Sequence, residues 1–150
     1  MGNWVPFVLL TVLTWGAYIP TLHRGQVALS GSGVHAFLMV GVAYLLVAIL
    51  IPGTMIARAG SWEVFTSGGM ALTVAAGVLG ALGALGIVFA LVNGGRPTVV
   101  PPLVFAGAPV VSVFVAMLYN PPQNSPSPVF FIGLVMAAAG AGLVLSFRPT

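Results

Sequence analysis

The charged side chains of this 150-residue chain are few and far apart. They are Arg24, Arg58, Glu63, Arg96 and Arg148, and the longest uncharged stretches between them have 33, 32 and 51 residues. A helix needs about 20 apolar residues to cross the hydrocarbon core of a bilayer, and a charge near the centre of that core costs several kcal/mol. Charges that lie only between long apolar stretches are therefore typical of a chain that crosses a membrane several times.

The composition agrees with this interpretation and excludes several classes of function. Hydrophobic residues make up 59% of the chain and charged residues 3%, against about 25% charged residues in an ordinary soluble domain. Four basic side chains without a cluster cannot follow a phosphate backbone, so no nucleic-acid partner is expected. Because the chain has no cysteine and only two histidines, we expect no metal site and no cofactor.

The turn-forming segments divide the chain into five apolar spans. We predict one transmembrane domain over residues 1–150, an all-α integral membrane bundle with helices at about 4–22, 34–51, 64–92, 97–119 and 129–147. Pro52-Gly53 is expected to end the second helix and Asn93-Gly94-Gly95 the third. The proline-rich segment 121–128 divides the last uncharged stretch, which at about 1.5 Å per residue is too long for one helix.

The arginines also predict an orientation. Residues 1–3 carry no basic side chain, so we expect the first span to be retained rather than cleaved as a signal peptide. Five spans would place the termini on opposite sides, with Arg24, Arg96 and Arg148 on one side and Arg58 on the other. The excess of arginine makes the first of these sides cytoplasmic. A margin of three to one is small enough to leave insertion in both orientations open.

Four segments carry a resemblance to a known family. Leu13-Thr14-Trp15-Gly16-Ala17-Tyr18-Ile19-Pro20 resembles the Trp-Gly signature of the drug/metabolite transporter superfamily, in its EamA-like branch. The Gly/Ala-rich segment 75–86 is similar to the third helix of that family's repeat. Segments 102–112 and 131–140 look like its fourth and fifth helices. The resemblance covers nearly the whole chain as a single EamA-like repeat.

This resemblance implies a function. Most members join two inverted repeats and transport small metabolites, so it implies a multi-pass transporter of a small organic solute in a bacterial cytoplasmic membrane. A single repeat implies a homodimer, in which an inverted arrangement would restore the usual symmetry. The chain lacks the acid that often ends the family's fourth helix, because Tyr119-Asn120-Pro121-Pro122 stands there. Proton exchange through a carboxylate is therefore not expected.

Aromatic and hydroxyl side chains of the first span are the first candidates for solute binding. Thr11, Trp15 and Tyr18 follow one another at i, i+4 and i+7, so they share one face of a helix. Trp15 lies about 16 Å beyond Trp4 along such a helix, too deep for an interfacial anchor. This stripe would suit a cavity for a partly polar solute. Packing between helices is the alternative interpretation.

Two further candidates lie in the second and fourth spans. Tyr44 falls near the middle of the membrane, where its phenol needs a partner in a neighbouring helix or in a hydrated cavity. Pro109 removes an N–H and releases the carbonyl of Phe105, a device by which transporters expose backbone dipoles. The alternative for Pro109 is a kink that only shapes the bundle.

Small residues predict the packing faces of the bundle. Ala76, Gly80 and Ala84 recur every four residues in the third span, as do Gly133, Ala137 and Ala141 in the fifth. These faces could serve contacts within the bundle or between two copies. A membrane subunit that assembles or regulates a larger complex, without transporting, therefore remains the rival function. No constellation of an intramembrane enzyme is present, so we do not expect an enzyme.

Overall fold

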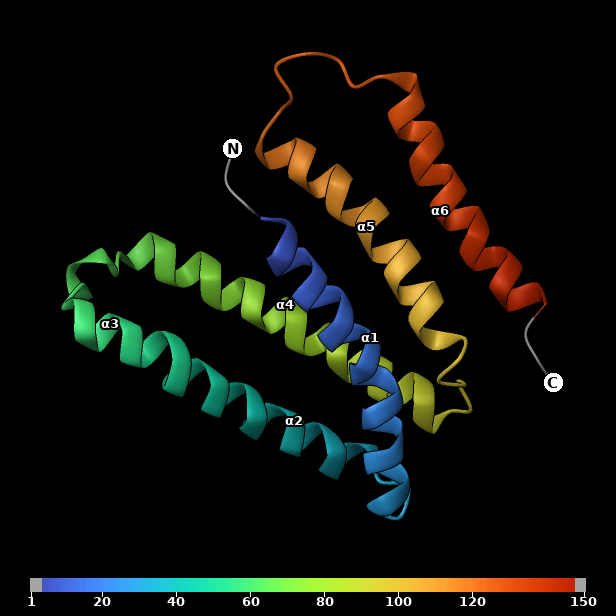
Figure 1. Cartoon of the computed structure of the whole chain (residues 1–150), viewed down its shortest axis with the longest axis horizontal. Helices are drawn as coiled ribbons and strands as arrows, with labels where there is room; N and C mark the ends of the chain where they lie inside the picture. The colour runs from blue at the N-terminus through green and yellow to red at the C-terminus, as the bar shows by residue number, and fades with distance from the viewer. Residues whose placement is uncertain (1–3, 148–150) are drawn as a thin grey trace. The chain divides into compact units, whose positions relative to one another are not determined.

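The computed structural model describes residues 4–147, and within that range every regular element is a helix (Figure 1). Five helical runs are long and apolar enough to cross a membrane: Val5–Ala28, Gly33–Ala59, Ser67–Val92, Val100–Tyr119 and Pro128–Ser146. The predicted all-α class and the predicted number of spans are confirmed. The chain thus has the elements of a multi-pass membrane protein.

The helices gather into two compact units. One unit consists of Ala17–Gly94, and the other of the described parts of Met1–Gly16 and Gly95–Thr150. Helix α1 (Val5–Ala28) contributes its first half to the second of these units and the rest to Ala17–Gly94. We call Ala17–Gly94 the central unit and the other the terminal unit.

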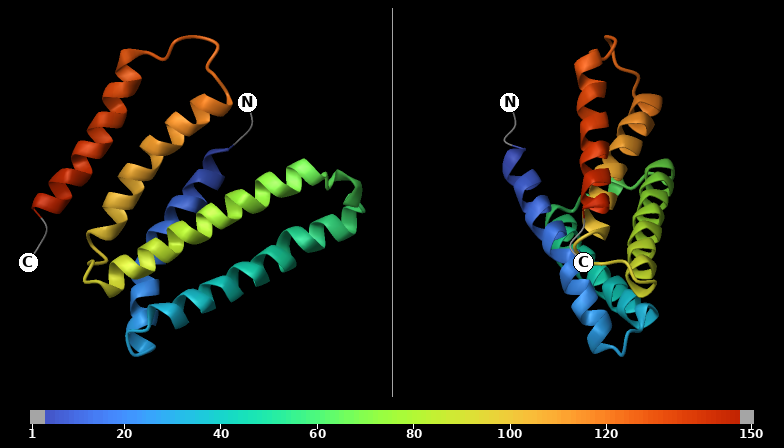
Figure 2. Two further views of the ribbon diagram at one scale, coloured as in Figure 1. Left: turned by 180° about the vertical axis from the view of Figure 1, so that it is seen from behind. Right: turned by 90° about the vertical axis from the view of Figure 1, so that its right-hand side faces the viewer.

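The central unit is built around two long neighbouring helical runs. Helix α2 (Gly33–Ala48) continues through the π-helix η1 (Ile49–Gly53) into α3 (Thr54–Ala59). The 3-10 helix η2 (Trp62–Val64) leads to α4 (Ser67–Val92), which lies beside α2 in both views of Figure 2.

Two helices of this unit run further than the sequence led us to expect. Helix α1 continues six residues beyond the predicted end at Leu22, because the helix accommodates Gly25 and the chain turns only at Ser30 and Gly31, whose φ angles are +57° and +78°. Pro52 does not end the second span, since a π-turn absorbs the missing N–H. That span ends instead at Gly60, where φ is +65°.

Local signals set both ends of α4. The Thr66 hydroxyl accepts a hydrogen bond from the Gly69 N–H at 3.3 Å, so the helix begins after Thr66 and not at Val64. At the other end, the Asn93 side-chain amide donates to the Phe89 carbonyl at 2.8 Å. Gly94 follows with φ of +90°, a conformation that favours glycine and turns the chain out of the helix.

The terminal unit contains α5 (Val100–Tyr119) and α6 (Pro128–Ser146), which form a hairpin side by side (Figures 1 and 2). Helix α5 begins three residues later than predicted, with prolines in its first turn. The Ser127 hydroxyl caps α6 by accepting from the Val129 N–H at 3.2 Å. Pro109 lies inside α5 without ending it.

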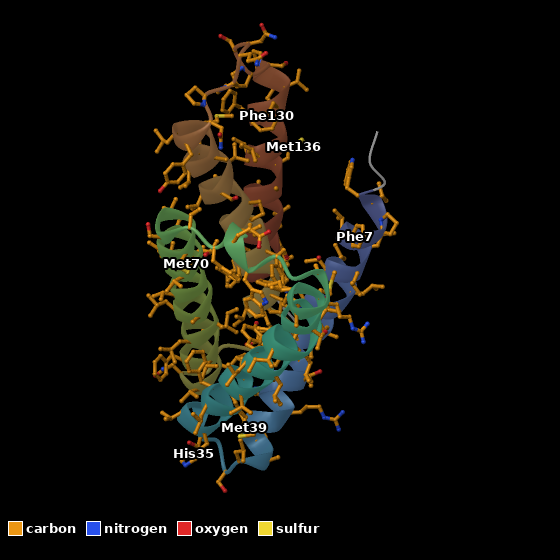
Figure 3. The ribbon with its side chains drawn as sticks, turned by 90° about the vertical axis from the view of Figure 1, so that its left-hand side faces the viewer. Phe7, His35, Met39, Met70, Phe130 and Met136 are labelled. Atoms are coloured by element: carbon orange, nitrogen blue, oxygen red, sulfur yellow. The ribbon has the colours of Figure 1, made fainter. Side chains whose placement is uncertain are left out.

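Most apolar side chains of the helices are exposed in the single chain. Figure 3 shows them standing out from the ribbons, among them Phe7, Met39 and Met136. The small-residue faces are largely uncovered as well: Gly80 and Ala137 are exposed, whereas Ala84 and Ala141 are buried. A lipid solvent or neighbouring protein chains can cover such a surface, and water cannot cover it cheaply.

Candidate functional site

An open cleft lies between the first half of α1 and α5, wholly within the terminal unit. Its volume is about 610 Å³, which falls in the range of small-molecule sites, about 300–1,000 Å³. None of the described residues that line it is charged. The lining residues are Thr11, Val12, Trp15, Gly16, Phe105, Ala108, Pro109 and Ser112.

Helical spacing explains why these residues meet. On α1, the lining positions are 11, 12, 15 and 16; on α5, they are 105, 108, 109 and 112. Each set follows the i, i+3, i+4 pattern of one helical face. The cleft is therefore formed by one face of each helix.

An aromatic pair spans the cleft from one helix to the other. The rings of Trp15 and Phe105 lie 5.9 Å apart between centroids, tilted by 54°, a separation at which aromatic pairs attract each other. Trp15 nevertheless keeps 51% of its surface exposed. Its indole N–H has no hydrogen-bond partner among residues 4–147. Trp15 thus offers both an apolar ring and an unused donor to the cleft.

The two hydroxyl groups of the lining differ in their hydrogen bonding. The Thr11 hydroxyl donates to the Phe7 carbonyl at 2.9 Å, so its proton is committed to its own helix. The Ser112 hydroxyl makes no hydrogen bond within the part of the chain that the structure describes. Ser112 is therefore the hydroxyl that remains available to donate to a bound molecule.

The backbone is unusual at two of the lining positions. Pro109 has no N–H, so the carbonyl of Phe105 lacks the donor that position 109 would otherwise supply. Gly16 can present only backbone atoms to the cleft. A Cβ built on Gly16 would meet no described atom within 4 Å. The cleft is thus open beside Gly16, and a side chain introduced there would occupy free space.

The structure brings together three of the five predicted site residues. Thr11, Trp15 and Pro109 line the cleft. Tyr18 and Tyr44 belong to the central unit and are not among the lining residues. The hydroxyl oxygen of Tyr18 is buried without a hydrogen-bond partner in the described chain, and Tyr44 is half-exposed.

Sequence reasoning did not select Gly16, Phe105 and Ser112 as site residues. Gly16 follows Trp15 directly, and a glycine beside a deep aromatic residue is a weak signal for an open space. Phe105 and Ser112 lie four residues before and three residues after Pro109, on the same helical face. Their positions could have been proposed from that spacing, but their approach to α1 could not.

Both histidines belong to the central unit. Within residues 4–147, no three His, Cys, Asp or Glu side chains gather as metal ligands. The His35 ring nitrogen Nδ1 lies 2.6 Å from the Ser32 hydroxyl near the start of α2. In contrast, the Nδ1 atom of His23 is buried and has no partner in the described part of the chain. Neither histidine lines the cleft.

Comparison of the chain with protein-family models, with curated proteins and with solved structures gave no match.

Proposed function

We propose that the protein is a membrane transporter of a small organic metabolite, built as one EamA-like repeat. The observation that carries the proposal is the 610 Å³ cleft, which combines an aromatic pair with an unbonded hydroxyl and a proline-released carbonyl. A mainly apolar wall with a few placed polar groups is typical of small-molecule sites. The cleft lies in helices that are long enough to cross a membrane.

The family resemblance supports the same assignment from a different direction. Trp15 and Gly16 belong to the segment that resembles the family's first-helix signature, and Pro109 belongs to the segment that resembles its fourth helix. All three line the cleft. These three residues therefore belong both to segments that carry the resemblance and to the lining of the cleft.

The transporter is proposed to work as a homodimer by alternating access in a bacterial cytoplasmic membrane. Two copies of opposite orientation would supply the inverted symmetry on which many transporters depend. The exposed small residues of α4 and α6 suit close contact with another helix. The distribution of arginines, three against one, leaves both orientations accessible.

Filling the cleft tests the proposal. Gly16→Leu would place a side chain in the open space, and Gly107→Leu on α5 is a matched control because Gly107 is exposed, does not line the cleft and meets no described atom within 4 Å. The readouts are solute-dependent thermal stabilisation over a metabolite panel and uptake of the stabilising solutes into proteoliposomes.

We expect a stabilising solute for the wild type and for Gly107→Leu, and its loss in Gly16→Leu with the fold intact. If no member of a broad panel stabilises or enters, or if Gly16→Leu transports normally, the proposal fails. A measured mass of a monomer that transports would refute the dimer alone.

A membrane subunit without transport activity is the second candidate, and one observation favours it. The small-residue faces of α4 and α6 are mostly uncovered, which suits a partner of a different sequence as well as a second copy. Purification in mild detergent separates the two. A stoichiometric partner of different sequence, together with absence of uptake, would favour the subunit.

A further inference from the structure

A second proline acts on the same cleft as Pro109. Pro20 lies inside α1, four residues after Gly16, and has no N–H to donate to the Gly16 carbonyl. Gly16 and Phe105 therefore both carry carbonyl groups that a proline has deprived of their helical donor. Both residues line the cleft. One such carbonyl comes from each of the two helices that form it.

Hydrogen-bond acceptors consequently outnumber donors in the cleft. The acceptors are the carbonyls of Gly16 and Phe105 and the oxygen of Thr11, whose own proton is bound to Phe7. The indole N–H of Trp15 is the donor without acceptor capacity, and the Ser112 hydroxyl can serve in either role. None of the described lining residues supplies a carboxylate or a basic group.

The excess of acceptors over donors, together with the absence of charge from the described lining residues, should distinguish solutes by their charge and by their hydrogen-bonding groups. A polar group held in apolar surroundings without a partner costs free energy, so a carbonyl that lacks its helical donor beside this cleft favours a ligand that donates to it. A carboxylate could accept from Trp15 and Ser112, but it would bring no donor for the carbonyls, and no described basic group lines the cleft to offset the loss of its hydration. An ammonium group would bring donors, but no acid lines the cleft to offset the loss of its hydration. An uncharged donor avoids both penalties.

We propose that the cleft selects uncharged solutes that join an apolar body to a hydrogen-bond-donating end such as a primary carboxamide. The apolar body packs against the Trp15–Phe105 ring pair, and the donor end pairs with the carbonyls of Gly16 and Phe105. The inference rests on the proposed function, because it takes the cleft as the solute site.

Four probes that share one apolar body test the selection. They are phenylacetamide, N,N-dimethylphenylacetamide, phenylacetate and the phenethylammonium ion. Binding to the purified full chain in lipid nanodiscs is measured by calorimetry. Phenylacetamide should bind at least tenfold more tightly than each of the other three, since the dimethyl amide lacks donors and the two ions carry charge.

Proline substitutions then identify the acceptors. Pro20→Ala restores an N–H to the Gly16 carbonyl without altering the cleft wall, because Pro20 is not a lining residue. Pro109→Ala restores an N–H to the Phe105 carbonyl, and because Pro109 is a lining residue it also shortens the cleft wall at that point. Both variants should keep or gain thermal stability, as alanine suits a helix better than proline, and each should reduce the preference for phenylacetamide over its dimethyl analogue at least threefold. Pro52→Ala, in η1 of the central unit, is the control that should leave this preference unchanged.

The outcomes separate this inference from the transport proposal. Equal binding of phenylacetamide and its dimethyl analogue would overturn the donor requirement and leave the cleft as a solute site. Tighter binding of either ion would overturn selection for uncharged solutes. If none of the four probes binds, the inference fails, whereas transport of another metabolite would leave the proposed function standing. A full preference retained in both Pro20→Ala and Pro109→Ala would refute the role of the released carbonyls.

Discussion

The central and terminal units use the same apolar residue types in opposite ways. In the central unit, Ile19 and Val88 are completely buried, and the buried side-chain amide of Gln26 donates to the Val88 carbonyl at 3.2 Å. In the terminal unit, the cleft leaves Trp15 half-exposed and its indole N–H without a partner among the described residues. In the central unit the buried polar side chain is hydrogen-bonded between helices, whereas in the terminal unit the polar group of Trp15 stays accessible.

Two glycines show the contrast most directly. A Cβ on Gly33, in the central unit, would lie 2.8 Å from side-chain carbons of both Val88 and Val92. A Cβ on Gly16, in the terminal unit, would meet no described atom within 4 Å. Glycine permits close packing at Gly33 and leaves space at Gly16. The residue type alone therefore does not reveal whether a glycine in a membrane helix closes a contact or opens one.

The largest expected effect is on the packing at Gly33. Gly33→Val would drive three carbons into Val88 and Val92, and we expect the free energy of unfolding in mixed micelles to fall by about 3 kcal/mol, the upper part of the range for overpacked cores. Gly41→Val is the control, since Gly41 lies in the same helix, is exposed and has open space beside it. Equal losses in the two variants would show that the close packing at Gly33 does not set the cost.

The second prediction concerns Trp15. Because half of its surface is exposed, Trp15→Ala should lower the free energy of unfolding by less than about 1 kcal/mol, well below the loss of about 3–5 kcal/mol for truncation of a core tryptophan. Solute binding should weaken at least tenfold, which corresponds to about 1.4 kcal/mol. Both quantities are measured on one preparation. A large loss of stability with unchanged affinity would assign Trp15 to packing and contradict the difference between the units.

A smaller effect is expected at Gln26. Gln26→Leu keeps the approximate volume of the side chain and removes its hydrogen bond to Val88, which should lower the free energy of unfolding by about 1 kcal/mol. Solute binding should not change, because Gln26 does not line the cleft. A gain in stability would show that the buried amide is a cost that the central unit tolerates and not a contact that holds it together.

The smallest effect is expected at Tyr18. Its buried hydroxyl oxygen has no partner among the described residues, so Tyr18→Phe removes a polar group that contributes no hydrogen bond within the chain. The free energy of unfolding should stay within about 0.5 kcal/mol of the wild type or rise slightly. Solute affinity is the second measurement. A clear loss of affinity would return Tyr18 to the binding site and extend that site beyond the cleft in the terminal unit.

Local patterns of the sequence predicted much of the fold. The five spans follow from charge spacing and bilayer thickness, and these depend only on how far apart residues stand along the chain. The end of α4 at Val92 follows from Asn93 and Gly94, which act on their own backbone. Pro52 shows the limit of such reasoning. A proline inside a helical run can end the helix or be absorbed by a π-turn, and the residue type alone does not distinguish the two outcomes.

The candidate site, like the fold, was only partly predictable from the sequence. The sequence by itself determined that Thr11 and Trp15 share a helical face and that Pro109 releases a carbonyl, because both follow from the geometry of one helix. Only the tertiary structure decided that this face and this carbonyl meet in one cleft, and that Tyr18 and Tyr44 do not line it. Contacts between α1 and α5 join residues about 90 positions apart. They depend on how two separate helices approach each other, which no periodicity within a single helix records.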